Sequence, residues 1–332
     1  MAPTNPVYAA ATLTAGLRAD FWETYRLTYG DVEKRLSDVV NLGVSSDKLT
    51  EIYGYFESAP YPRHWPRGQG VPSKAFKSVQ FNVTNLDWGR RVPRHVNDRM
   101  DDQTQSLFQM ARMAGEHWAT LPERVFFQIL TGTADAELLP AIPLAPDGAN
   151  LYSATDGGGN PRFGVAGGNT FAGTGVATGA AVRTDFFDAI ERFRLFQDTE
   201  GQPLWDDSIV DQGYVCFFNV ANWRVFAEAF QQERTAELVA AGAGAGVTNI
   251  ILASGVKVEM RPTQRIVGNN WNVFLKGSKL KSVFQQVRQP LFESNATWDN
   301  SDMVRDTGEE YIQWKSREGY GVLLPYQTIQ IT

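Results

Sequence analysis

The sequence is poor in cysteine and has no excess of basic charge. Its single cysteine, Cys216, excludes a disulfide within the chain and any zinc or iron–sulfur centre ligated by several cysteines. Cys216 lies in the apolar segment 214–218, where we expect a small buried side chain and not a nucleophile. Among 332 residues, 31 Lys and Arg face 37 Asp and Glu, for a net charge of −6. A dedicated nucleic-acid binder is not expected, because phosphate recognition needs a dense basic surface.

Catalytic and ligand-binding patterns are also scarce. The histidines, His64, His95 and His117, show no metal-ligand spacing. The glycines of segment 173–179 approach a dinucleotide-binding pattern, but no strand precedes them and one residue is in excess. Residues 147–156 resemble a calcium loop in composition only, which leaves cation binding open as an alternative. We therefore expect no catalytic residue, no metal and no cofactor.

The first half of the chain predicts helices, one extended loop and a hairpin. Apolar residues at steps of three or four predict one or two helices over residues 12–41. Four Pro and two Gly in residues 59–73 predict an extended loop. Alternating apolar residues on both sides of Thr84-Asn85 then predict a long hairpin over residues 76–96. A helix capped by Asp101 or Asp102 should follow as far as Leu130, with a kink or restart at Pro122.

The second half predicts a glycine-rich loop and then a mixture of helices and strands. Nine glycines in residues 157–179 predict a long loop with little fixed structure of its own. A helix from Asp185, a strand over 214–218 and a helix from Asn219 or Asn222 follow. Strands are expected at 256–260, 271–276, 283–287, 311–316 and 322–331. The uncharged segment 238–256 is broken by glycines and is not expected to span a membrane. The class is α+β, without a regular βαβ repeat.

Charge is segregated along the chain. Residues 61–96 carry a local charge of +6, and residues 292–310 carry −5. Residues 195–211 contain five acids and no base. One interpretation is that the basic segment of one copy of the chain contacts an acidic segment of another copy. The alternative is that these segments are solvent-exposed faces and that their charges are segregated by chance. The candidate subunit-contact residues are Arg63, Arg67, Lys74, Lys77, Arg90, Arg91, Asp198, Glu200, Asp206, Asp207, Glu309 and Glu310.

Several segments resemble one protein family in their amino-acid sequences and in their order along the chain. They are residues 45–65 (SSDKLTEIYGYFESAPYPRHW), 76–102 (FKSVQFNVTNLDWGRRVPRHVNDRMDD), 113–130 (MAGEHWATLPERVFFQIL), 147–153 (DGANLYS) and 271–274 (WNVF). This series resembles the major capsid proteins of tailed bacteriophages with the Hong Kong 97-type fold, and is most similar to the Mu-like major head subunits.

The resemblance implies an architecture and a function. Residues 1–60 would form an N-terminal arm and 61–88 an extended loop across an adjacent subunit. Residues 89–139 would form a peripheral domain with a spine helix at 103–131. Residues 140–275 would form an axial domain that includes the loop 157–179, and 276–332 would return to the peripheral domain.

The implied function is self-assembly, through hexamers and pentamers, into an icosahedral shell around double-stranded DNA, and not catalysis. The shell would belong to a virion assembled in the cytoplasm of a host bacterium, without a membrane. Expected partners are copies of itself, a separate scaffolding protein, a portal and decoration proteins, with non-specific contact to packaged DNA. Two alternatives remain: an encapsulin-like protein compartment, and a carbohydrate- or nucleotide-handling enzyme, which would require a discrete pocket in a monomer.

Overall fold

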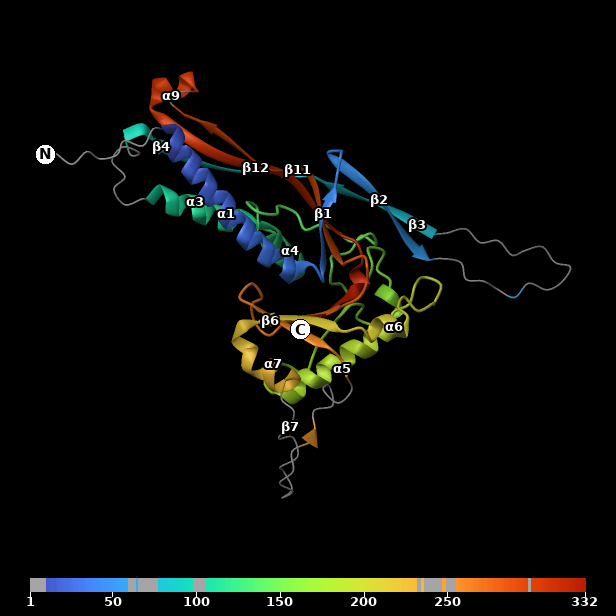
Figure 1. The fold of residues 1–332 in the computed structure, drawn as a ribbon. Helices are drawn as coiled ribbons and strands as arrows, with labels where there is room; N and C mark the ends of the chain where they lie inside the picture. Colours follow the sequence, from blue (N-terminus) through green and yellow to red (C-terminus); the bar gives the residue numbers. More distant parts are fainter. Residues whose placement is uncertain are drawn as a thin grey trace.

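Two larger β-sheets with helices on their faces, and two separate strand pairs, make up the structure (Figure 1). It is a computed structural model that describes residues 10–58, 64, 77–97, 106–231, 234–235, 247–248, 255–297 and 300–332. The four-stranded sheet has the order β1 (Val40–Ser45), β11 (Val283–Ala296), β12 (Glu309–Val322), β4 (Leu86–His95). The five-stranded sheet has the order β5 (Thr170–Phe171), β13 (Thr328–Ile331), β10 (Trp271–Leu275), β6 (Tyr214–Asn219), β9 (Val258–Thr263). Two further antiparallel pairs are β2 (Thr50–Ser58) with β3 (Lys77–Thr84), and β7 (Arg234–Thr235) with β8 (Val247–Thr248).

The helices divide between the two sheets. The α-helices are α1 (Ala10–Leu36), α3 (Ser106–Ala119), α4 (Leu121–Thr131), α5 (Gly179–Leu195), α6 (Asp207–Val210), α7 (Trp223–Phe230) and α9 (Asp302–Thr307). Figure 1 shows α1, α3 and α4 beside the four-stranded sheet, and α5 and α7 on the outer face of the five-stranded sheet. The α+β class predicted from the sequence is confirmed.

The N-terminal helix packs on its own subunit. Leu17 and Phe21 of α1 are buried, and the Phe21 ring stacks on Trp314 of β12 with the ring centroids 4.2 Å apart. The arm expected over residues 1–60 therefore buries much of its apolar side within one chain.

The two sheets share a hydrophobic core around α4. Phe126 and Phe127 of this helix contact Phe217 of β6, with ring centroids 5.7 and 5.6 Å apart. Phe126 also contacts Phe274 of β10, at 5.9 Å. The same cluster includes Val283 of β11, so α4 lies where the two halves of the molecule join. Pro122 restarts the helix as predicted, because α3 ends at Ala119 and α4 begins at Leu121.

The hairpin expected over residues 76–96 is not formed, and that prediction is wrong. β3 pairs with β2 and β4 pairs with β12, while the chain passes from β3 to β4 through Asn85. Asn85 is buried, and its Nδ2 donates to Ser46 Oγ at 2.8 Å and to the Lys48 carbonyl at 2.7 Å. Its Oδ1 accepts from Gln286 Nε2 at 3.0 Å. These bonds satisfy the amide in an extended chain, so the residue does not form the predicted turn.

The last strand belongs to a different sheet from the two long strands before it. Within residues 276–332, β11 and β12 join the four-stranded sheet. β13 inserts between β5 and β10 in the five-stranded sheet, where Ile329 and Ile331 are buried. Its apolar alternation fits either sheet, and the position of β10 beside it decides the pairing.

A close approach between α1 and α3 yields the first prediction. A Cβ at Gly115 of α3 would lie 2.6 Å from the Phe21 carbonyl oxygen, whereas one at Gly30 of α1 would meet nothing within 4 Å. We expect Gly115→Ala to lower the free energy of unfolding by ~1–3 kcal/mol through overpacking. The control Gly30→Ala should raise it by roughly 0.5–1 kcal/mol, because alanine favours a helix. Urea denaturation of both variants measures the difference, and equal effects would contradict the close approach.

Candidate subunit-contact site

The basic loop that the sequence singled out is largely outside the described residues. Arg63, Arg67 and Lys74 lie there, and of Lys77 only the backbone at the start of β3 is described. Arg90 and Arg91 are exposed on β4, where the strand pairs with β12. The Arg91 guanidinium lies 3.6 Å from the ring centroid of Tyr311, so part of its surface is already used within the chain.

The acidic residues at the start of β12 have different environments. Glu309 is exposed, whereas Glu310 is fully buried and accepts a hydrogen bond from Arg94 Nε at 3.0 Å. Arg94 is itself buried, so this ion pair belongs to the interior of the subunit. Of these two glutamates, Glu309 is the one whose side chain is exposed. Asp302 and Asp306 of α9 are exposed beside it.

The second acidic segment surrounds the short helix α6. Asp198 shapes a turn, because its Oδ1 accepts from the backbone N–H groups of Glu200 and Gln202 at 2.8 and 2.9 Å. Glu200 is exposed, as are Asp206 and Asp207 at the start of α6. The Asp207 side chain is 82% exposed, and its closest basic group is Arg194, 3.6 Å away.

The glycine-rich loop has little regular secondary structure, as expected, but side-chain hydrogen bonds tie it to other segments. Arg162 lies inside it at 2% exposure. Its Nε and Nη2 donate to the Asp147 carboxylate at 2.6 and 2.9 Å, and its Nη1 donates to the Leu151 carbonyl at 2.9 Å. Asn169, fully buried, donates to the Leu151 and Pro325 carbonyls. The buried guanidinium thus ties the glycine-rich loop to residues 147–151. Arg162 thereby pairs with Asp147, a carboxylate of segment 147–156, whose composition resembles a calcium-binding loop.

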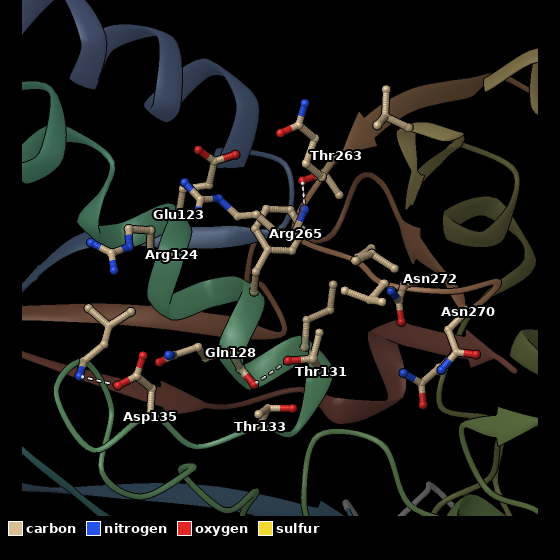
Figure 2. Close-up of a pocket in the computed structure, with 18 of the residues that line it drawn as sticks. Glu123, Arg124, Gln128, Thr131, Thr133, Asp135, Thr263, Arg265, Asn270 and Asn272 are labelled. Atoms are coloured by element: carbon tan, nitrogen blue, oxygen red, sulfur yellow. Dashed lines mark hydrogen bonds between the residues drawn. The ribbon is translucent and has the colours of Figure 1, made fainter. Parts of the chain in front are cut away.

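A large polar pocket lies between α4 and one end of the five-stranded sheet. Its volume is about 1170 Å³. Figure 2 shows Glu123, Arg124 and Gln128 of α4 on one side of the pocket, and Arg265 and Asn272 from β9, β10 and the loop between them on the other. α4 ends at Thr131, where Gly132 in the left-handed conformation lets the chain turn, and residues after this turn and in the loop after β9 line the pocket.

The pocket contains more cationic than anionic groups. The Arg35 guanidinium pairs with Glu123 at 2.9 Å and also donates to the Pro262 carbonyl. Within the described part of the chain, the side chains of Arg124 and Arg265 have no acidic partner. Partial burial lowers the pKa of Arg265; Glu123 opposes this shift, while Arg124 and Arg35 add to it. The pocket lining therefore carries three guanidinium groups and two carboxylates, and of these only Arg35 and Glu123 form an ion pair with each other.

The pocket wall also presents amide oxygens without hydrogen-bond partners. Asn272 is 2% exposed, and neither its Oδ1 nor the buried Oε1 of Gln128 has a partner among the described residues. Such groups are costly to bury unless a ligand or a partner supplies the missing bond. Sequence reasoning missed this site. Arg124 and Arg265 are 141 positions apart, and no local pattern connects them.

Cys216 is fully buried in β6, as predicted, and burial raises the pKa of its thiol. In the ranges that the structure describes, no three His, Cys, Asp or Glu side chains are grouped so that they could hold a metal ion. Nor does any helix in those ranges combine the length and apolarity needed to cross a membrane. Most of the uncharged segment 238–256 falls outside them.

Known structures resemble this chain in fold although not closely in sequence. No protein-family model matches the sequence, and no curated protein matches it. The capsid structure of cyanophage P-SCSP1u superposes with a TM-score of 0.57 at 14% identity, covering 89% of this chain and 86% of that one. The mature capsid of bacteriophage PhiM1 gives 0.52 at 9% identity, covering 89% and 85%. The capsid of Myoviridae phage XM1 gives 0.50 at 9% identity, covering 87% and 89%. The chain therefore has the fold of these bacteriophage capsid structures, and the predicted Hong Kong 97-like α+β architecture is confirmed.

Proposed function

We propose that this chain is the major capsid protein of a tailed bacteriophage. It would assemble through hexamers and pentamers into an icosahedral shell that encloses double-stranded DNA. The observation that carries the proposal is the likeness to the cyanophage capsid over 89% of the chain and 86% of that protein. The match covers most of both chains, so it is not limited to one shared motif.

The domain roles follow from the same proposal. The four-stranded sheet with α3 and α4 would be the peripheral domain, and the five-stranded sheet would be the axial domain around the capsomer axis. The loop within residues 61–88 would extend onto an adjacent copy. Its basic residues would meet the exposed carboxylates of Glu309, Asp302 and Asp306, which lie at the far end of the molecule from β2 and β3 (Figure 1).

The narrower assignments rest on sequence motifs. The segments 45–65, 76–102 and 113–130 support a relationship to the Mu-like major head subunits. By the same resemblance, assembly would take place in the cytoplasm of a host bacterium with a separate scaffolding protein, a portal and decoration proteins. DNA inside the shell would be contacted without sequence specificity. No catalytic role is part of the proposal.

Particle size and content test the function directly. The purified chain should form uniform closed particles in light scattering and negative-stain microscopy, and particles from a complete phage should protect double-stranded DNA from nuclease. Particles that enclose a protein cargo and no DNA would favour the encapsulin-like alternative. A chain that stays monomeric at high concentration, with or without its scaffold, would refute both.

A further inference from the structure

The polar pocket beside α4 has a chemistry that calls for an acidic ligand. Arg124 and Arg265 offer guanidinium donors that have no carboxylate partner within the described residues. Asn272 and Gln128 offer amide groups with oxygens that lack a donor. A ligand that fits must therefore bring carboxylates for the arginines and a hydroxyl or N–H donor for the amides.

One exposed segment of the chain carries this combination. Asp206, Asp207 and Ser208 are consecutive and exposed at the start of α6. Asp206 precedes the helix without capping it through its side chain, so its carboxylate is available. Asp207 lies 3.6 Å from Arg194 but its side chain is 82% exposed, so both carboxylates can be offered to the two arginines and the Ser208 hydroxyl to an amide oxygen.

Topology places this segment and the pocket at opposite ends of the five-stranded sheet. β6 and β9 are parallel, with Tyr214 opposite Val258 and Asn219 opposite Thr263. α6 immediately precedes β6, whereas the pocket loop 264–270 immediately follows β9. A strand of six residues separates them by about 17 Å, and Figure 1 shows α6 on the other side of the molecule from that loop. They cannot meet within one subunit.

We propose that the pocket of one copy receives Asp206 and Asp207 of the next copy around the capsomer. The inference rests on the proposed shell function and names a contact that function would use. Two different, complementary surfaces at opposite ends of one subunit make a heterologous contact, and such contacts close into rings when the rotation allows. Val220 and Val267, exposed on the rim of the pocket, would be covered in the same contact.

A nucleic acid fits the pocket less well. Phosphates would also suit the arginines, but Glu123 and Asp135 line the same pocket and would repel a continuous polyanion. A short acidic segment carries its charge on a few side chains, which can contact the arginines without approaching the carboxylates of Glu123 and Asp135.

A charge swap tests the contact. The variant Arg124→Glu/Arg265→Glu should raise the protein concentration needed for assembly by about tenfold or more, and Asp206→Arg/Asp207→Arg should do the same. Combining all four substitutions restores opposite charges across every interface, so assembly should recover most of the loss. Failure of the combined variant to recover, while circular dichroism shows it folded, would overturn the inference.

A cross-linking experiment tests the contact independently of the proposed shell function. Because the chain's own Cys216 is buried, a short bismaleimide should react only with the introduced thiols of Asp207→Cys/Arg265→Cys. A ladder of linked subunits is expected, and the control Asp207→Cys/Asp188→Cys, with Asp188 exposed on α5, should give none. Closed particles without a ladder would refute the contact and leave the shell function intact. A ladder from oligomers that never close would refute the shell and support the contact.

Discussion

Reversing the charge of the extended loop should strongly impair assembly. We expect the variant Arg63→Glu/Arg67→Glu/Lys74→Glu/Lys77→Glu to require a much higher concentration for particle formation than the unmodified chain. Each exposed ion pair contributes only ~0.2–1 kcal/mol, but four reversals turn attraction into repulsion at every copy of the contact. A cost of ~2 kcal/mol per subunit would raise the required concentration roughly 30-fold.

The dependence of assembly on salt concentration shows whether charge repulsion causes the defect of the reversed variant. Because the Debye length is ~10 Å at 0.1 M salt, adding salt should relieve the repulsion and partly restore assembly of the reversed variant. The matched control exchanges the same positions for the other basic residue, Arg63→Lys/Arg67→Lys/Lys74→Arg/Lys77→Arg, and should assemble like the unmodified chain. Light scattering across a salt series measures both. Equal assembly and equal salt dependence of the reversed variant would mean that the charge segregation is not functional.

The second large effect is expected at Arg162. Its side chain is 1% exposed, and its bonds to Asp147, Asn150, Leu151 and Asn169 hold the glycine-rich loop against segment 147–151. Arg162→Ala would leave the Asp147 carboxylate without its cation and the Asn150 carbonyl without this donor, whereas the Leu151 carbonyl would keep its bond from Asn169. We expect the free energy of unfolding to fall by ~3–5 kcal/mol, the typical cost of breaking a buried ion pair on one side.

An exposed arginine provides the control for Arg162. Arg305 pairs with Asp302 at 2.9 Å across one helical turn, and both side chains are at least half exposed. Arg305→Ala should therefore cost under about 1 kcal/mol. Urea denaturation of the unassembled chain measures both variants, provided that the slope with denaturant stays the same. A loss for Arg162→Ala no larger than that for Arg305→Ala would show that the loop does not depend on this guanidinium.

The wrong hairpin prediction and the unpredicted side-chain bonds of the glycine-rich loop have a common physical origin. Alternation before and after Asn85 predicted two strands and correctly located them, but pairing depends on which other strands reach their edges. β2 and β12 supply those edges from elsewhere in the chain. In the glycine-rich loop, composition predicted an absence of regular structure, and this is largely what residues 157–169 show. Composition could not predict order, because the order depends on Arg162 reaching partners outside the glycine-rich segment.

Several features of this protein could be predicted from residues that are neighbours along the chain. The apolar segment around Cys216 became the buried strand β6, and Pro122 restarted a helix, because each outcome depends on neighbours along the chain. The ordered series of motifs also indicated the fold that the capsid structures share. Which charges are available to a neighbour was decided only by the tertiary structure. Glu309 and Glu310 are adjacent in sequence, yet one is exposed and the other is buried against Arg94. The pocket of Arg124 and Arg265 likewise exists only because α4 and the loop after β9 converge, and side chains that act together through space need no pattern along the chain.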